Sequence, residues 1–263
     1  MRFGRVLGAS GCLLILACEA TVNVPPANEL YEKAVSDQKE ESYSIAVEQY
    51  RMFLDHYPLD PRSRDAELRL ADSYFADEAW PEAIVAYSNF QRMHPTHQDI
   101  DRVEFRIAAA YEAQIDTLDR DLGAAQNAHQ RYHSLVLRHA GSPAAQEAQE
   151  ALAKVREHLA ARELYVASFY LDRGKQEAGE ARVAATLVRY PETKAARDAI
   201  RRLEEFARAE GDNELAELAA AAAKDHPRSQ PEAGPDTPLG PATVELRNRL
   251  VAQRTTRPAP ATP

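Results

Sequence analysis

Hydrophobic side chains in residues 64–97 recur at the spacing of two amphipathic helices separated by a short turn. Apolar residues three or four positions apart share one face of a helix, so each run predicts a helix with one buried stripe. Pro81 suits the first turn of the second helix, and Pro95 ends that helix. Neither helix can bury its stripe alone, so each requires the other and a neighbouring pair. The two stripes consist of Leu68, Ala71, Tyr74 and Phe75, and then of Ala83, Ala86, Tyr87 and Phe90.

The order of small and aromatic residues in these stripes, closed by a proline, is the tetratricopeptide repeat (TPR) pattern. The unit recurs at regular spacing, since Pro95 follows Pro58 by 37 residues and Pro227 follows Pro191 by 36. One such pattern occurs by chance in many helices, whereas five in register predict an all-α fold, a TPR solenoid of about five helix pairs. The other units are marked by Ala34, Ala46, Tyr50 and Pro58; by Ala108, Tyr111, Ala128 and Tyr132; by Ala167, Tyr170, Gly179 and Pro191; and by Ala219–Ala223.

Three segments depart from the regular repeat. The turn of the third unit is eight residues longer than that of the second, and its charged residues are expected in a solvated loop: Asp116, Asp119, Arg120 and Asp121. No helix breaker interrupts residues 143–171, which predict one long helix that divides the array into an N-terminal half (29–142) and a C-terminal half (143–227). Residues 228–263 hold 7 of the 16 prolines and no strong hydrophobic face, so we expect a disordered tail apart from a short helix over 244–251.

The first 18 residues have the features of a bacterial lipoprotein signal peptide. Arg2 and Arg5 precede an apolar core of about ten residues, which is too short to span a bilayer as a helix. The small residue Ala17 directly precedes Cys18, as in a lipobox. This pattern predicts cleavage after residue 17 and attachment of lipid to the Cys18 thiol. The alternative, a buried cysteine in an N-terminal helix, does not account for these flanking residues.

A short linker joins the predicted anchor to the repeats. Residues 18–28 contain Pro25 and Pro26, which stiffen the linker and prevent a helix before Glu29. Glu19, and not an aspartate, follows the cysteine, which favours the outer membrane over retention in the inner membrane.

The charge balance limits the classes of partner. The chain of 263 residues has 32 lysines and arginines against 41 aspartates and glutamates, a formal charge of −9 that becomes −11 when Arg2 and Arg5 leave with the signal peptide. An acidic chain of this kind disfavours nucleic acid and general electrostatic binding to anionic lipid. The mature chain would keep one cysteine, so no disulfide is possible.

No catalytic signature occurs in the chain. The sequence has no HExxH, GxSxG, CxxC or glycine-rich phosphate loop, so we expect no enzyme and no cofactor. The best metal candidate is the pair His129 and His133, one helical turn apart, with His139 further along. A metal site needs a third ligand and supporting groups, so we interpret the pair as exposed histidines on a repeat helix and predict no metal site.

Several motifs resemble one known family. The run from Tyr165 to Gly174, the dipeptide Arg182-Val183 and the stretch from Arg189 to Ala199 closely resemble the BamD (ComL) family, lipoproteins of the outer-membrane β-barrel assembly machinery. The resemblance covers roughly residues 15–227 and includes further short matches, at Pro25–Tyr31, His94–Asp101 and Asp119–Asp121.

This resemblance implies a function and a set of partner-binding residues. A member of the family would be a scaffold on the periplasmic face of the cell outer membrane. It would bind the periplasmic domains of the barrel-forming subunit, other lipoproteins of the machinery and unfolded outer-membrane proteins. By position in the motifs, the residues expected to contact partners are Tyr170, Arg173, Arg182 and Arg197.

Other interpretations remain open from the sequence. Arg182 could instead form an ion pair within its own helix, with Glu177 or Glu180. The chain could be a different TPR lipoprotein of the envelope, such as a secretin pilotin or a cell-division coordinator. A periplasmic hydrolase or metal-dependent enzyme is a third class, and the missing catalytic motifs argue against it.

Overall fold

The computed structural model describes residues 24–118, 121–229 and 237–256. Within these ranges the regular structure consists of eleven α-helices and one short 3₁₀ turn, with no strand. The predicted lipidation site Cys18 and the loop residues Asp119 and Arg120 lie outside the described residues. The helices are α1 (Ala27–Lys39), α2 (Tyr43–His56), α3 (Ser63–Ala76), α4 (Trp80–Met93), α5 (Ile100–Glu112), α6 (Gly123–Arg138), α7 (Pro143–Leu171), α8 (Gln176–Arg189), α9 (Lys194–Glu210), α10 (Asn213–Asp225) and α11 (Pro241–Thr256), with the 3₁₀ turn η1 at Pro227–Ser229.

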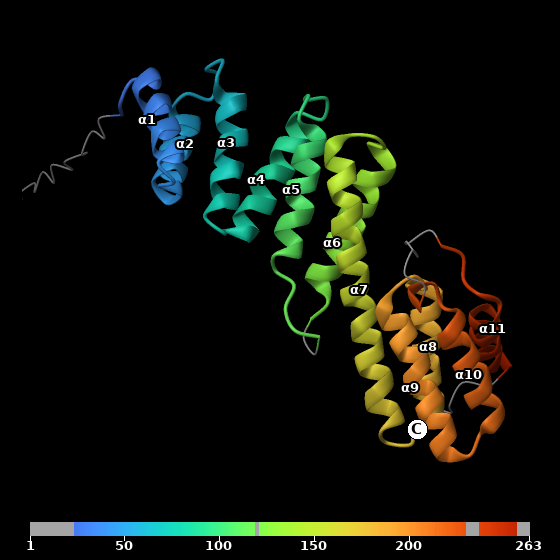
Figure 1. Ribbon diagram of the computed structural model, residues 1–263. Coiled ribbons are helices and arrows are strands. Elements are labelled where there is room, and N and C mark those ends of the chain that lie inside the picture. The colour runs from blue at the N-terminus through green and yellow to red at the C-terminus, as the bar shows by residue number, and fades with distance from the viewer. Residues whose placement is uncertain (1–23, 119–120, 230–236, 257–263) are drawn as a thin grey trace, which may run out of the picture.

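Consecutive helices pack side by side and form an elongated array that begins with α1 and ends with α10 and α11 (Figure 1). The pairs α1–α2, α3–α4 and α5–α6 stack in order, and α9–α10 closes the series together with α11. The predicted all-α TPR solenoid is therefore confirmed.

The small and aromatic positions of the repeat set the helix spacing. The small residues of the first three units are fully buried where helices meet: Ala34, Ala46, Ala71, Ala83, Ala108 and Ala128. A tyrosine ring fills the space beside them in each unit, and its hydroxyl donates to the preceding helix. These hydrogen bonds run from Tyr50 to Gln38 (3.2 Å), from Tyr87 to Asp72 (2.5 Å) and from Tyr132 to Glu112 (2.6 Å). Each buried hydroxyl is thus satisfied, and burial raises the pKa of each of these tyrosines.

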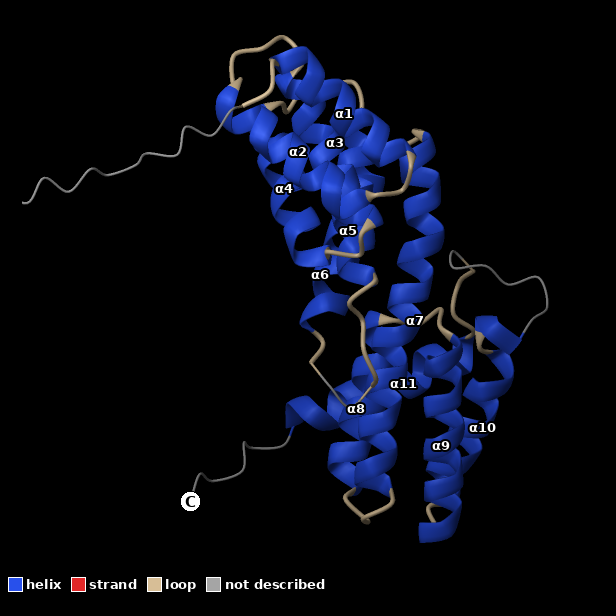
Figure 2. Ribbon diagram, turned by 90° about the vertical axis from the view of Figure 1, so that its left-hand side faces the viewer, coloured by secondary structure: helices blue, strands red, loops and turns tan. Residues whose placement is uncertain are grey.

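The long helix α7 belongs to two hydrophobic cores. Its first half contributes Ala148 and Val155 to the core of α5 and α6, and its second half contributes Ala167 and Leu171 to the core of α8–α11. Figure 2 shows α7 running from one half of the array into the other. The helix has the bounds expected from the absence of breakers in the sequence.

Polar contacts fix the second half of the array to the middle of α7. Glu157 of α7 accepts the backbone N–H groups of Lys194 (2.8 Å) and Ala195 (2.9 Å), the first turn of α9. A carboxylate at a helix N-terminus satisfies free N–H groups and interacts favourably with the helix dipole. Next to it, Arg156 forms a bidentate ion pair with Glu192, with distances of 2.5 and 3.0 Å.

The C-terminal region is more ordered than the sequence predicted. Instead of a short helix over 244–251 in a disordered tail, helix α11 spans Pro241–Thr256 and packs on α8 and α10. Leu246 and Leu250, one turn apart, are buried in the core of this end. Asp225 of α10 accepts the N–H groups of Ala242 (2.7 Å) and Thr243 (3.2 Å) and so caps the new helix. This cap comes from another helix, which local sequence patterns do not show. The rest of the tail, residues 230–236 and 257–263, lies outside the described residues.

Gly179 of α8 lies directly against Leu171 of α7. A Cβ at this position of α8 would lie 2.3 Å from Leu171 Cδ2 and 2.6 Å from its Cγ, so Gly179→Ala should lower the free energy of unfolding by about 1–3 kcal/mol. The Leu171→Ala change alone should also destabilise, by about 2–5 kcal/mol, because it leaves a cavity. In the Leu171→Ala background, however, Gly179→Ala should be neutral or stabilising, since alanine favours helix over glycine. Urea unfolding of the four proteins tests this, and a loss of similar size in both backgrounds would contradict it.

Candidate partner-binding surface

Two aromatic rings lie exposed on the outer face of α7. Tyr165 and Phe169 are four residues apart, so they share this face, and they are 49% and 45% exposed. An arginine stacks on each ring: the guanidinium carbon of Arg162 is 5.6 Å from the Tyr165 centroid, and that of Arg173 is 3.6 Å from the Phe169 centroid. Arg173 also donates to the Phe169 carbonyl (3.1 Å) at the end of the helix. Cation–π contacts of this kind hold both charge and ring in place on the surface.

Helix α8 carries two arginines that pair with α7. Arg182 pairs with Glu163 of α7 at 3.1 Å, and Arg189 reaches the other oxygen of the same carboxylate at 3.6 Å. Glu163 is largely buried, whereas the Arg182 side chain is 45% exposed. The ion pair of Arg182 therefore joins two helices. Glu180, one of the partners considered within α8, is buried and instead accepts from Gln176 (2.8 Å).

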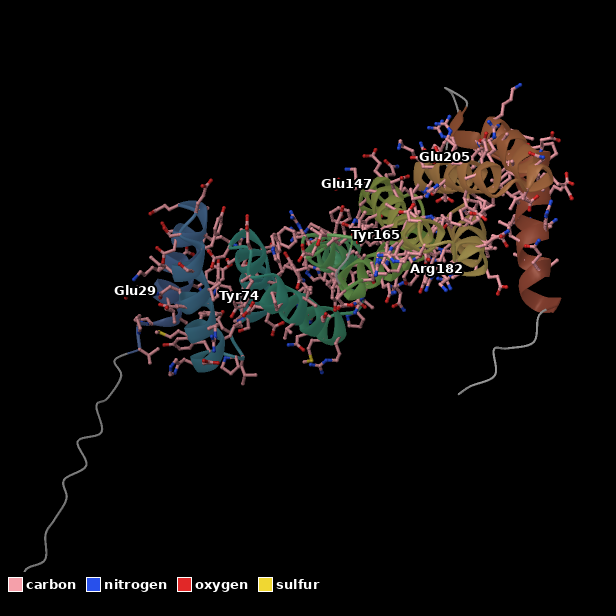
Figure 3. All side chains as sticks on the ribbon, turned by 90° about the horizontal axis from the view of Figure 1, so that it is seen from below. Glu29, Tyr74, Glu147, Tyr165, Arg182 and Glu205 are labelled. Atoms are coloured by element: carbon pink, nitrogen blue, oxygen red, sulfur yellow. The ribbon has the colours of Figure 1, made fainter. Side chains whose placement is uncertain are left out.

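We call these residues of the two helices and their connecting turn the α7–α8 surface: Arg162, Tyr165, Phe169, Arg173, Arg182 and Arg189. Figure 3 labels Tyr165 on α7 and Arg182 on the neighbouring helix α8. Both arginines of α8 share one carboxylate, that of Glu163 on α7. Asp172, beside Arg173 in the chain, is paired with Arg202 of α9. The α7–α8 surface is thus positive on a chain whose formal charge is −9.

Comparison with known proteins agrees with the repeat pattern and the motifs. The family model YfiO, described as an outer membrane lipoprotein, matches residues 24–222. The chain belongs to the YfiO family of outer membrane lipoproteins.

Several proteins similar to this chain carry the same name. A protein of Vibrio cholerae named outer membrane protein assembly factor BamD is 26% identical over 213 residues, which cover 76% of this chain and 88% of that protein. Proteins of the same name from Neisseria gonorrhoeae (27% over 186 residues, 67% of this chain and 70% of that one) and Xylella fastidiosa strain 9a5c (24% over 257 residues, 92% and 88%) are also similar.

Three of the four predicted partner residues lie on α7, on α8 or in the turn between them. Arg173 and Arg182 belong to the α7–α8 surface, and the half-buried Tyr170 lies edge-on to Phe169, with ring centroids 5.6 Å apart. Arg197 lies apart from them. Its side chain is only 19% exposed, and it donates to the carbonyl of Arg228 (3.1 Å), a contact that ties α9 to η1.

The other members of the surface were not predicted from the sequence. Tyr165 and Phe169 lie in the quoted family motif, but their outward direction follows only from the position of α7 between two cores. The four-residue spacing of two aromatics on an otherwise polar helix face was the signal that could have identified them.

The histidine pair differs from expectation. His129 and His133 stack with ring centroids 6.0 Å apart, but His129 is only partly exposed, with its Nε2 3.4 Å from Arg156. The interpretation of both as exposed histidines is therefore wrong for His129, because α7 covers it. His139 lies elsewhere, beside Glu104. Among the described residues, no three histidine, cysteine or acidic side chains are grouped so that they could hold a metal ion. Likewise, none of the helices described is both long and apolar enough to cross a membrane.

The folded protein should lose stability at acidic pH, because the fold lowers the pKa of two histidines. Burial lowers the pKa of His129, with further lowering by Arg156 and His133, and burial also lowers the pKa of His226. A histidine that stays neutral when folded but takes a proton when unfolded favours the unfolded state below its ordinary pKa of about 6.5. The free energy of unfolding should therefore fall between pH 7.5 and 5. Urea unfolding at pH 7.5 and at pH 5 measures this change. The fall in the free energy of unfolding should be smaller in His129→Gln than in the wild type, whereas the exposed control His56→Gln should show the wild-type fall. An unchanged fall in His129→Gln would contradict this account.

Proposed function

We propose that this protein is a lipid-anchored scaffold of the outer-membrane β-barrel assembly machinery, held at the periplasmic face of the outer membrane. It binds the periplasmic domains of the barrel-forming subunit and nascent outer-membrane proteins, alongside other lipoproteins, and promotes barrel insertion without catalytic chemistry. Membership of the outer membrane lipoprotein family over residues 24–222, with relatives named as outer membrane protein assembly factors, supports this role. The same finding favours it over a secretin pilotin or a cell-division coordinator.

The observation that carries the partner assignment is the α7–α8 surface. Exposed tyrosine and arginine side chains are enriched among residues that dominate the energy of protein interfaces. Here Arg162 and Arg173 are held against aromatic rings, so little side-chain freedom is left to lose on binding. The barrel-forming subunit would place a carboxylate near Arg182 and apolar groups on Tyr165 and Phe169.

Arg182 is suited to this role because its internal pair leaves it accessible. The side chain remains 45% exposed while bound to Glu163, so a second carboxylate can approach without breaking that pair. Partly exposed ion pairs within one chain contribute only about 0–1 kcal/mol. Removal of one member of a desolvated pair across an interface costs roughly 2–5 kcal/mol. The loss of a contact between Arg182 and a partner should therefore cost more free energy than the loss of its internal ion pair.

The anchor sets where this surface can act. The proposed lipid is on Cys18, six residues before Val24, the first described residue. At roughly 3.3–3.6 Å per extended residue, the linker keeps the start of the array within about 20 Å of the membrane. The α7–α8 surface, in the fourth unit, lies further along the array, beyond the first three helix pairs (Figure 1).

Charge reversal at Arg182 tests the partner assignment. Arg182→Glu should reduce co-purification of the barrel-forming subunit from detergent-solubilised envelopes at least tenfold, because the proposed carboxylate partner would then be repelled. The matched control is Glu163→Gln, which removes the internal partner of Arg182 and Arg189 but keeps both positive charges. Circular dichroism and melting temperature should stay near the wild-type values in both variants.

The control separates the two interpretations of Arg182. If Glu163→Gln weakens co-purification as much as Arg182→Glu does, the α7–α8 ion pair acts by supporting the fold. Wild-type co-purification of Arg182→Glu would remove Arg182 from the binding surface altogether.

The anchor has its own test. Each buried CH₂ contributes about 0.8 kcal/mol to membrane binding, and several acyl chains together give stable attachment. Cys18→Ala should therefore leave the protein uncleaved by lipoprotein signal peptidase or free in the periplasm, as seen by immunoblotting of envelope fractions. Cleaved Cys18→Ala protein that still fractionates wholly with the outer membrane would show that lipid on this residue is not the anchor.

A further inference from the structure

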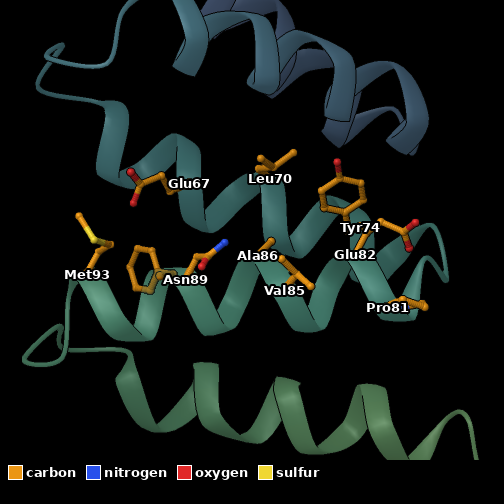
Figure 4. Close-up of a pocket in the computed structure, with 10 residues that line it drawn as sticks. Glu67, Leu70, Tyr74, Pro81, Glu82, Val85, Ala86, Asn89 and Met93 are labelled. Atoms are coloured by element: carbon orange, nitrogen blue, oxygen red, sulfur yellow. The ribbon is translucent and has the colours of Figure 1, made fainter.

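A groove runs between α3 and α4, in the second unit and away from the α7–α8 surface (Figure 4). Its volume is about 490 Å³. The side chains that line it come from the facing sides of the two helices, with Leu70 and Tyr74 from α3 and Ala86 and Phe90 from α4. Because these positions recur every three or four residues, they form a continuous apolar wall along the groove.

The rim of the groove is apolar and exposed. Val85 and Met93, two turns apart on α4, are each 60% exposed, while Phe90 is buried in the floor. Large apolar side chains that line a groove at the surface mark a place where another apolar group binds. Nothing else in the described part of this unit covers them, so a partner would gain by removing them from water.

The charged side chains that line the groove are both negative, and Arg92, which is not part of the lining, donates to the lining residue Asn89 at 3.2 Å. Two of the lining residues are carboxylates, Glu67 and Glu82, and none is a lysine or arginine. They lie toward opposite ends: Figure 4 shows Glu67 near Met93, and Glu82 near Pro81 and Tyr74. Glu67 accepts a hydrogen bond from His94 Nε2 at 2.7 Å and remains partly exposed. Along α4, positions 82 and 93 are separated by about 16 Å at 1.5 Å per residue.

We propose that this groove binds a partner polypeptide segment in which a few apolar side chains are flanked on both sides by lysine or arginine. About five extended residues at 3.3 Å each span the stretch of α4 between positions 82 and 93, near whose ends the two carboxylates lie. Alternate side chains of such a segment face the apolar floor, and the flanking cations meet Glu67 and Glu82. The same carboxylates repel a free C-terminal carboxylate and anionic lipid headgroups, so the groove selects an internal segment of a chain.

The inference extends the proposed scaffold function by naming the chemistry of one bound segment. It does not depend on the barrel-forming subunit, so its test can fail while the α7–α8 surface stands. The α7–α8 surface can likewise fail its test while the groove stands.

The chain supplies its own reporter for this groove. Trp80 is the single tryptophan and begins α4 next to Pro81, which lines the groove, and its ring packs edge-on against Phe75 at 5.0 Å. Titration of the mature full-length protein with tryptophan-free peptides can therefore be followed by Trp80 fluorescence and checked by calorimetry. The probe is acetyl-Lys-Ser-Leu-Ser-Phe-Ser-Lys-amide, in which both lysines lie on the same side of the extended chain as the two apolar residues. Its comparisons are the same peptide with glutamate at both ends, and a lysine-flanked peptide with serine at both apolar positions.

The lysine-flanked apolar peptide should bind at least tenfold more tightly than either comparison peptide. The double variant Glu67→Gln/Glu82→Gln should lose the preference for lysine over glutamate ends but retain binding of apolar segments. Val85→Asp, at an exposed position that the fold does not need, should weaken binding at least tenfold. Leu137→Asp, at an equally exposed leucine on α6, should leave it unchanged.

Three results would overturn the proposal. These are the absence of binding by the lysine-flanked peptide, equal binding of the lysine-flanked and glutamate-flanked peptides, and an unchanged affinity in Val85→Asp with an unchanged melting temperature.

Discussion

The structure depends on one helix that serves two hydrophobic cores. Because the first half of α7 packs with α5 and α6 and its second half with α8–α11, the orientation of the two halves of the array is set by a single rigid rod. Two polar contacts near its middle, from Arg156 to Glu192 and from Glu157 to the start of α9, prevent the second half from rotating about that rod. Gly179 lets α8 approach closely enough for Glu163 to meet arginines of the neighbouring helix.

This geometry separates two surfaces of opposite character. The α7–α8 surface is cationic and carries exposed aromatic rings, whereas the α3–α4 groove is apolar and flanked by carboxylates. In a repeat array each unit contacts mainly its neighbours, so distant units can evolve different chemistry without disturbing a shared core. A scaffold that holds one protein while receiving segments of another needs two such surfaces, at a fixed separation.

The sequence was sufficient for the fold because the repeat is a local pattern. Buried alanines such as Ala71 and Ala83 recur at fixed spacing, and the lack of breakers in 143–171 predicted the bounds of α7. What depends on contacts between distant residues was not predictable from spacing. Helix α11 is capped by Asp225 from another helix, His129 is covered by α7, and Arg182 pairs with Glu163 nineteen residues away. Tyr165 and Phe169 likewise point outward because other sides of α7 are buried in two hydrophobic cores. A single hydrophobic stripe in the sequence does not show this.

Hydroxyl-radical footprinting with the purified periplasmic domains of the barrel-forming subunit tests the proposed scaffold most directly. The method measures the oxidation of individual side chains, so it reports on Tyr165 and Phe169 separately from Met93 on the α3–α4 groove. If the α7–α8 surface binds this subunit, oxidation of Tyr165 and Phe169 should fall several-fold on complex formation, while that of Met93 stays unchanged. A complex in which both rings remain as reactive as in the free protein would contradict the account.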